Sequence, residues 1–362
     1  MAEERTVRGA LIGCGFFAEN QMQAWQQLQR DGKRVEIVAL CDRDPQRLAH
    51  FQTLFGIEAT FTDANAMFEA FAGGGADGKD SDLDFVDIAT TTQAHAALVP
   101  LAADHGVDII CQKPFAGSLE TARQLIEHCK TRGVTLGIHE NFRWQQAVRS
   151  TIEALRDGAI GQPFFGRISY RNGFDVYRAQ PYLAEVERFI IEDLGIHVLD
   201  IARALFGEVD RLGCEIARVN PAINGEDVAT MMLHHDTGVT AVVDCSYATR
   251  LADDPFPQSL IEIDGKRGSL RLRQDFTLEI HAIEGGCEIR DVRPESPAWS
   301  EAPWRPIQQS VLAFQRDWLG AQRQGRSVET RGEDNFNTLA LVEAAYRAAA
   351  IHQTVVPERW ER

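Results

Sequence analysis

The chain has 362 residues, of which 44% are apolar and 25% are charged, as in an ordinary globular protein with a buried core. At roughly 150 residues per domain, this length favours two domains. Acidic residues (53) outnumber basic ones (37), and the net charge of −16 argues against nucleic acid or an anionic membrane surface as a partner.

The first part of the chain alternates short apolar runs with amphipathic helical patterns, which is typical of βαβ units and a parallel sheet. The sequence predicts a helix at residues 16–29 and strands at residues 8–12, 36–41, 85–89, 107–111 and 134–139. A stretch rich in Gly and Asp, residues 73–80, interrupts this rhythm and is interpreted as a solvated loop. We therefore expect a doubly wound parallel α/β domain over residues 1–142.

A Gly-x-Gly-x-x-Ala motif joins the first predicted strand to the first helix. Gly13 permits the tight turn, Gly15 leaves room for a pyrophosphate, and Ala18 lets helix and strand pack closely. The backbone N–H groups of Phe16 and Phe17 open the helix, where they can hold phosphate without a basic side chain. The motif predicts a dinucleotide site, although two glycines in such a turn can also be purely structural.

Asp42 ends the second predicted strand, near the expected spacing of roughly 20 residues after such a motif. A carboxylate at this position accepts hydrogen bonds from the adenosine ribose and repels a 2′-phosphate. We therefore expect NAD rather than NADP as the cofactor. Arg43 keeps dual use open, because its guanidinium could meet a 2′-phosphate.

Candidate catalytic groups occur in two later segments. Lys113 precedes Pro114 at the carboxyl edge of the fifth predicted strand, where doubly wound sheets bind ligands, and it could orient or acidify a substrate hydroxyl. Taken alone, it could equally be a surface lysine before a turn. Asp193 and His197 stand four residues apart at a helix start, so they share a face. A histidine with a carboxylate partner suits a general base near neutral pH, and a structural histidine is the alternative. We interpret Asp200 as a structural hydrogen-bonding partner.

Beyond about residue 145 the pattern changes to successive strands with short connections, which favours an antiparallel sheet and an α+β domain over residues 143–362. The sequence predicts strands at residues 164–170, 209–219, 228–235, 239–247, 261–264 and 269–272. Residues 284–305, rich in Pro and Gly, are expected to be loops, and residues 337–351 a final amphipathic helix. Apolar residues at 231–233 and 241–243 exceed what one covered face needs, so we expect a homo-dimer or homo-tetramer built through this domain.

Taken with a Thr-Thr-Thr-Gln-Ala-His turn after the fourth predicted strand, these motifs make nearly the whole chain resemble the Gfo/Idh/MocA oxidoreductase family. The resemblance implies a Rossmann domain followed by an α+β domain with a large, mainly antiparallel open sheet, and NAD(P)-linked oxidation of sugars and polyols. It implies that Lys113, Asp193 and His197 form the catalytic triad, with His197 as the base. It also implies further cofactor contacts by Thr90, Thr91, His95, Gln112, Lys113 and Arg143.

Gln112 stands where the family usually has Glu. A neutral amide can still hydrogen-bond the nicotinamide ribose, but it cannot pair ionically with Lys113. Candidates for substrate contact are Lys113, Arg143, Asp175, Asp193 and His197. Asp175, like Asn172 and Tyr247, ends or follows a strand of the second domain, so it could line the pocket or belong to a solvated sheet edge.

A narrower resemblance, carried by residues 9–18, 110–116, 139–145 and 189–203, is to family members that oxidise a branched aldopentose to its lactone. Three alternatives stay open: another polyol or inositol-type dehydrogenase, an NAD-dependent glycosidase with transient redox chemistry, and a non-catalytic NAD-bound regulator. Retention of Lys113, Asp193 and His197 disfavours the regulator. The expected partner is a small sugar.

Cysteine usage and hydropathy indicate the cellular setting. The seven cysteines include no Cys-x-x-Cys pair, so we expect neither a disulfide framework nor a metal site. No apolar run reaches the ~18 residues that suggest a membrane span. The first residues lack the charged-then-apolar pattern of a secretion signal. These features favour the reducing cytoplasm.

Overall fold

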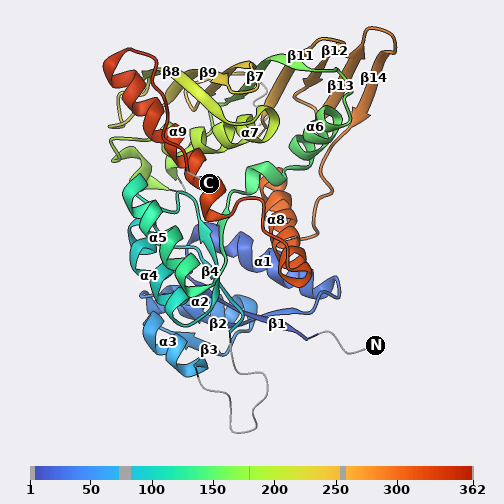
Figure 1. Cartoon of the computed structure of the whole chain (residues 1–362). Coiled ribbons are helices and arrows are strands. Elements are labelled where there is room, and N and C mark those ends of the chain that lie inside the picture. The colour runs from blue at the N-terminus through green and yellow to red at the C-terminus, as the bar shows by residue number, and fades with distance from the viewer. Residues whose placement is uncertain (1–4, 73–82, 179, 253–257, 361–362) are drawn as a thin grey trace. The chain divides into compact units, whose positions relative to one another are not determined.

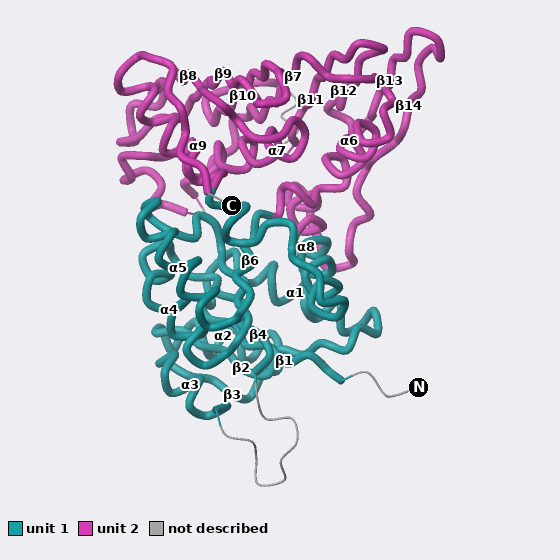
Figure 2. Tube along the Cα trace, viewed as in Figure 1, with its two compact units in different colours: residues 1–140, 311–336 teal, residues 141–310, 337–362 magenta. Residues whose placement is uncertain are grey.

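The computed structural model describes residues 5–72, 83–178, 180–252 and 258–360, and the predicted loop at 73–80 lies outside them. The chain divides into two compact units, coloured separately in Figure 2: unit 1 is residues 1–140 and 311–336, and unit 2 is residues 141–310 and 337–362. The sequence predicts a single boundary at residue 142, whereas in the structure the chain returns to unit 1 at residues 311–336.

Unit 1 is built on a six-stranded parallel sheet with the order β3-β2-β1-β4-β5-β6. Its strands are β1 (Val7–Ile12), β2 (Val35–Cys41), β3 (Ala59–Phe61), β4 (Phe85–Ile88), β5 (Asp108–Gln112) and β6 (Leu136–His139). The predicted doubly wound sheet is confirmed. The strand order reverses between β1 and β4, and doubly wound folds bind ligands at the carboxyl ends of the strands at such a switch point.

Helices cover both faces of this sheet. They are α1 (Phe16–Arg30), α2 (Pro45–Phe55), α3 (Ala64–Phe71), α4 (Thr92–Asp104), α5 (Leu119–Arg132) and residues 311–324 of α8 (Arg305–Gln324). Figure 1 shows α4 and α5 together on one side of the sheet, with α1 and α8 on the other. Trp25 of α1 and Trp318 of α8 meet with ring centroids 6.1 Å apart, and both pack on Phe85. This aromatic cluster attaches residues 311–324 to the sheet, and the sequence does not predict it.

Asp87 of β4 is a fully buried carboxyl group that accepts hydrogen bonds from Gln21 Nε2 (3.0 Å) and Trp25 Nε1 (2.9 Å). Burial raises the pKa of Asp87 to about 7, although the Trp25 hydrogen bond lowers it. Because this pKa lies above that of the unfolded chain, the native state binds the extra proton. The associated stability is fully present below about pH 4 and is lost as the pH rises through about 7.

We therefore expect Asp87→Asn to flatten the pH dependence of the free energy of unfolding between about pH 4 and pH 7. Urea titrations of wild type and variant at half-unit pH steps measure this difference. Parallel curves for the two proteins across this range would show that Asp87 does not carry the effect.

Unit 2 contains an eight-stranded sheet with the order β14-β13-β12-β11-β7-β10-β9-β8. Its strands are β7 (Pro163–Arg171), β8 (Val209–Ala217), β9 (Val228–His235), β10 (Thr240–Ser246), β11 (Leu260–Gly265), β12 (Gly268–Leu272), β13 (Thr277–Ala282) and β14 (Gly286–Asp291). β7 and β10 pair in parallel, and the other neighbours in this order pair antiparallel. The predicted large, mainly antiparallel sheet is confirmed.

The remaining elements of unit 2 are helical. They are α6 (Gln146–Arg156), α7 (Ile196–Phe206), residues 337–351 of α9 (Gly332–Ile351), the short 3₁₀ turns η1 (Asn141–Trp144), η2 (Val176–Arg178) and η3 (Pro181–Ala184), and the π-helical turn η4 (Ile191–Gly195). α7 packs on β7 and β10 and α6 on β12. Among the described residues, no helix has the length and hydropathy needed to span a membrane.

The structure confirms the predicted final helix and most of the predicted loop in the C-terminal third, with one correction to each. The stretch expected to be loops, residues 284–305, contains β14, which pairs with β13 at the edge of the sheet. Most side chains of β14 are exposed, so it lacks the alternation of apolar and polar residues that would reveal a strand. The last helix begins at Gly332 rather than at 337.

Candidate active site

The glycine-rich turn between β1 and α1 has the geometry that a pyrophosphate requires. Gly13 has φ +97°, and a Cβ there would lie 2.7 Å from the carbonyl oxygen of Ala89, so another residue would be both strained and blocked. Gly15 caps α1, and a Cβ added to it meets nothing within 4 Å. The turn therefore leaves open space before the first N–H groups of α1, which begin at Phe16 and Phe17. These residues fit a dinucleotide.

Asp42 lies beside this turn, fixed by two backbone N–H groups. Its Oδ2 accepts from Cys14 N (2.7 Å) and its Oδ1 from Asp44 N (2.8 Å). Each carboxylate oxygen has a further lone pair, which a ribose hydroxyl can use. Burial is the main cause that raises the pKa values of the Cys14 and Cys41 thiols to about 12, and the negative charge of Asp42 is the second cause. These thiols therefore stay protonated. Arg43 is exposed.

The negative charge of Asp42 leads to a prediction about cofactor choice. Asp42→Ser is expected to raise the ratio of kcat/KM with NADP to that with NAD by about tenfold or more, because repulsion of the 2′-phosphate is lost. Asp42→Asn is the matched variant, which keeps the size and one acceptor but removes the charge. Steady-state kinetics with both cofactors measure the ratio. A wild type that already prefers NADP would contradict the assignment of Asp42.

His95 of α4 contacts the turn that follows β4. Thr90 follows β4, and Thr91 is the N-cap of α4. His95 is fully buried, with Nε2 3.2 Å from the carbonyl oxygen of Thr90. Burial lowers the pKa of His95, while backbone groups of Thr90, Phe115 and Pro114 act in the opposite direction. The buried imidazole thus supports the turn of Thr90, and the contact of His95 with the cofactor stays a prediction.

Lys113 stands at the carboxyl end of β5, as predicted, and is partly buried. The preceding Gln112 folds its side chain back, so that its Oε1 accepts the backbone N–H of Lys113 at 2.7 Å. The amide that replaces the usual Glu thus fixes the backbone of Lys113, and its NH₂ group remains the donor that it can offer to a ligand.

Asp193 lies in the π-helical turn η4, a rare geometry that is often found at functional sites. Its Oδ2 accepts a hydrogen bond from Tyr247 Oη at 3.2 Å. Burial, and next the negative charge of Asp193, raise the pKa of Tyr247 well above its usual value, so the phenol stays a donor. Tyr247, only one of several pocket candidates in the sequence, is thus placed directly on a predicted catalytic residue. The pairing of Asp193 with His197 stays a prediction.

His197, in the first turn of α7, is 5% exposed. Its imidazole stacks on the ring of Phe142 from η1, with centroids 3.9 Å apart and planes 6° from parallel. Phe142 also packs on Tyr170 of β7. The plane of the imidazole is therefore set by a residue from a distant part of the chain. The sequence does not reveal this contact, because only the fold brings the two rings together.

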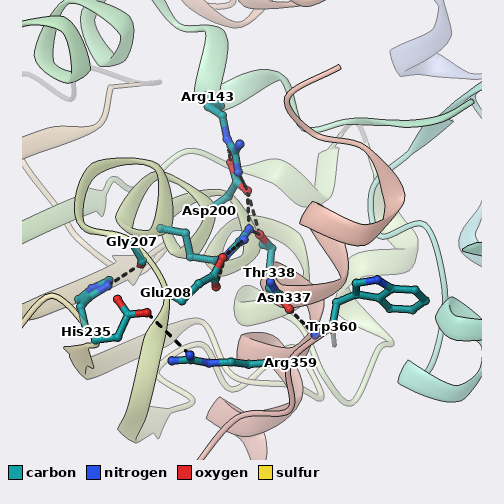
Figure 3. A network of polar contacts seen from close by, with 11 residues as sticks. Arg143, Asp200, Gly207, Glu208, His235, Asn337, Thr338, Arg359 and Trp360 are labelled. Carbon is teal, nitrogen blue, oxygen red and sulfur yellow. Dashed lines mark hydrogen bonds and ion pairs between the residues drawn. The ribbon is translucent and has the colours of Figure 1, made fainter. Parts of the chain in front are cut away.

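Arg143, predicted to contact cofactor and substrate, is buried in a network shown in Figure 3. Its Nε and Nη2 donate to Asp200 Oδ2 and Oδ1 at 2.7 and 2.6 Å, a bidentate pair. Thr338 Oγ1 donates to Asp200 Oδ1 at 2.8 Å, and Arg203 Nη1 donates to Thr338 Oγ1 at 2.8 Å. Asp200 thus has the expected structural role. The contact of Arg143 with a ligand stays a prediction. The pairing with Asp200 fixes the position of Arg143, which directly follows Phe142 in η1.

The remaining predicted site residue, Asp175, is exposed between β7 and η2. Nearby Asn172 is buried and accepts the backbone N–H of Phe174 at 3.0 Å. Within the described part of the chain, no group of three or more His, Cys, Asp or Glu side chains could hold a metal ion.

The predicted site residues divide between the units. Unit 1 contains Gly13, Gly15, Phe16, Phe17, Asp42, Arg43, Thr90, Thr91, His95, Gln112 and Lys113. Unit 2 contains Arg143, Asp175, Asp193 and His197.

Known proteins resemble the chain over nearly its full length. D-apiose dehydrogenases from Paraburkholderia graminis and Rhizobium rhizogenes are 53% and 52% identical to it, each over 96% of this chain and 89% and 97% of their own lengths. The crystal structure of an oxidoreductase from Agrobacterium radiobacter in complex with NAD+, L-tartaric acid and magnesium superposes with a TM-score of 0.91 at 51% identity, covering 97% of this chain and 98% of that one.

Family models match both halves of the chain. Residues 7–140 match the oxidoreductase family with an NAD-binding Rossmann fold, and residues 148–271 match the Gfo/Idh/MocA C-terminal domain. With the glycine-rich turn, the position of Asp42 beside it and the strand order already described, the chain belongs to the Gfo/Idh/MocA family of oxidoreductases.

Proposed function

We propose that this protein is an NAD-dependent sugar dehydrogenase that oxidises D-apiose to its lactone. The observation that carries this proposal is the 53% and 52% identity to two D-apiose dehydrogenases across 96% of the chain. The geometry of the glycine-rich turn and Asp42 supports NAD as the cofactor. An inositol-type dehydrogenase and a glycosidase with transient redox chemistry are less favoured, because the relatives with 53% and 52% identity are D-apiose dehydrogenases.

NAD+, when bound, supplies the hydride acceptor, so that oxidation of the sugar yields lactone, NADH and one proton. The cofactor would be held by Gly13, Gly15, Phe16, Phe17, Asp42, Arg43, Thr90, Thr91, His95, Gln112, Lys113 and Arg143. Among these, Gly13 and Gly15 leave the space for the pyrophosphate, and Asp42 offers oxygens to the ribose.

The proton chemistry falls to the chain's own side chains. We assign His197 as the base that takes the substrate hydroxyl proton, with its ring plane set by Phe142. Asp193, itself held by Tyr247, would orient the imidazole and stabilise its protonated form. Lys113 would stabilise the developing alkoxide through its positive charge. Arg143 and Asp175 are the further candidates for contact with the sugar.

A sugar panel tests the reaction. NADH absorbance is followed with D-apiose, D-ribose, D-xylose and myo-inositol at equal concentrations. We expect D-apiose to give the highest kcat/KM and NADH to accumulate in proportion to lactone. If myo-inositol gives the highest kcat/KM, the substrate is a polyol rather than D-apiose. Cleavage of a glycoside without net NADH would indicate the glycosidase.

We also propose a homo-dimer or homo-tetramer in the cytoplasm, formed through the sheet of unit 2. Strand register places Met232, Val242 and Arg167 in one row on the face opposite the buried residues, and Ile289 lies in the same row. Met232 and Ile289 are 60% and 68% exposed. The apolar side chains of Met232 and Val242 at one end of this row favour a contact between copies, and four charged residues separate them from Ile289. The seven cysteines are free thiols, which suits a reducing compartment.

Light scattering at micromolar protein checks the assembly, and a mass of two or four times the 40.3 kDa chain is expected. Met232→Lys should shift the mass towards the monomer. A 40.3 kDa particle for the unmodified protein would rule the assembly out.

A further inference from the structure

Glu226 is a buried carboxyl group, 5% exposed, for which the proposed chemistry has no use. It lies just before β9, yet its oxygens accept the backbone N–H of Phe189 (3.2 Å to Oε1) and of Ile191 (3.3 Å to Oε1). Its own carbonyl oxygen accepts the N–H of Ile190 at 3.1 Å. The first N–H groups of a helix lack partners within the helix. Glu226 thus caps the start of the segment that continues into η4 and α7.

The loop that carries Glu226 is shaped for this approach. A Cβ on Gly225 would lie 2.8 Å from the carbonyl oxygen of Val186 and 2.9 Å from Phe189 Cβ, so only glycine fits without a shift of the backbone. Next to it, Asn224 N donates to the carbonyl oxygen of Ala184 at 3.0 Å. Two successive residues thus dock the loop on the segment before η4.

A second anchor comes from α9. Tyr346 Oη donates to Glu226 Oε1 at 2.6 Å. Burial, and next the charge of Glu226, raise the pKa of Tyr346 well above its usual value, so this phenol stays a donor. Arg188 lies over the Tyr346 ring at 4.0 Å and pairs with Glu343 at 2.7 Å and with Glu192 at 2.8 Å. The start of η4 is therefore joined to α9 by a charged and aromatic cluster.

Phe189 transmits this anchoring to Asp193. The Phe189 N–H donates to Glu226, and its carbonyl oxygen accepts the N–H of Asp193 at 2.9 Å. The Phe189 ring stacks on Tyr247, with centroids 5.7 Å apart, and Tyr247 donates to the Asp193 carboxylate. Phe189 thus connects Glu226 to the backbone of Asp193 and, through Tyr247, to the Asp193 carboxylate.

We propose that Glu226, supported by Tyr346, is a positioning residue for the dehydrogenase reaction: it fixes the start of η4 so that the Asp193 carboxylate keeps the placement that proton transfer needs. This inference rests on the proposed function, because it assumes that Asp193 takes part in the reaction. Glu226 does not itself touch the substrate in this role, so its effect reaches the chemistry through Phe189.

The test compares Glu226→Ala with Glu226→Gln. Glu226→Ala is expected to lower kcat by about 10- to 100-fold, because small misplacements of reacting groups have effects of this size. The dissociation constant for NAD, measured by titration, should stay unchanged, since the expected cofactor residues are in unit 1. Glu226→Gln should recover most of the activity: its amide oxygen accepts the same N–H groups, and the Tyr346 hydroxyl can turn to accept from the amide NH₂.

Two further variants complete the design. Glu215→Ala is the matched control, because Glu215 is an exposed glutamate on β8, and its kcat should equal that of the wild type. Tyr346→Phe should lower kcat by a few-fold, and it decides the question if Glu226→Ala does not fold. All rates are taken at a temperature where near-UV circular dichroism shows native packing. Wild-type kcat in folded Glu226→Ala, or in folded Tyr346→Phe if the first variant fails to fold, would overturn the proposal.

Hydrogen exchange separates this inference from the proposed function. Glu226→Ala, or Tyr346→Phe in its place, should accelerate amide exchange in peptides covering residues 189–197, and Glu226→Gln should not. Unchanged exchange in that segment would overturn the positioning role whatever the enzyme oxidises. If none of the sugars supports NAD reduction by the wild type, the proposed function fails. The exchange experiment alone then decides whether Glu226 anchors η4.

Discussion

His197→Ala is expected to lower kcat by ~10²–10⁴-fold, the usual effect of removing a general base. The reason is that the substrate hydroxyl would have to release its proton without an acceptor at hand. Binding of NAD should stay within about twofold of the wild type, because Gly13, Gly15 and Asp42 are in unit 1 and do not depend on His197. Steady-state kinetics at saturating NAD and sugar, with titration of NAD binding, measure both quantities.

The matched control is His234→Ala, because His234 lies on β9 and belongs to none of the predicted site residues. Its kcat should match the wild type. The rise in rate with pH that a histidine base gives near neutrality should vanish in His197→Ala and persist in the control. If His197→Ala keeps both the wild-type kcat and its pH profile, His197 is structural and Lys113 becomes the better candidate for the base.

The positions of the expected cofactor residues in the fold could be predicted from sequence because the geometry there is local. Gly13 and Gly15 belong to one strand-to-helix turn, and Asp42 directly follows the neighbouring strand, so spacing along the chain fixes their places. The place of Lys113 can be predicted for the same reason, since β5 ends at Gln112, directly before it. In this part of the molecule the order of elements determines where each side chain lies.

The surroundings of the residues expected to carry out proton transfer could be predicted only in part, because the contacts of these residues join distant segments of the chain. The Tyr247 hydrogen bond to Asp193 spans 54 positions, and the pairing of Arg143 with Asp200 spans 57. No periodicity encodes such pairs, which depend on how β10, η4 and α7 pack. The sequence predicts Arg143 as a ligand-binding group, which stays a prediction, but it does not reveal that the Arg143 guanidinium pairs with the buried carboxylate of Asp200.

Edge strand β14 shows the same limit for the fold. Its residues are largely exposed, so there is no apolar face from which to recognise a strand. β13 does carry that signal, since Leu278 and Ile280 alternate with less buried neighbours. A strand without a buried face is specified by hydrogen bonding to its neighbour, and that information lies in the partner rather than in the strand itself.

Lys113→Met is expected to lower kcat by ~10²–10³-fold, the effect of removing one group that stabilises developing negative charge in the transition state. Methionine keeps most of the length of the side chain and removes the charge, so the loss reports electrostatics rather than packing. The change in NAD affinity should be small beside the loss in kcat. Lys266→Met, at a surface turn of unit 2, is the matched control and should leave kcat unchanged.

The double variant Lys113→Met/His197→Ala decides whether the two residues serve one step. Groups that act on the same proton transfer work as a unit, so the double variant should lose little more than the worse of the two single variants. Fully multiplied losses would mean that Lys113 and His197 act in separate steps. Non-additive losses in kcat with intact NAD binding would instead assign Lys113 and His197 to the same proton transfer.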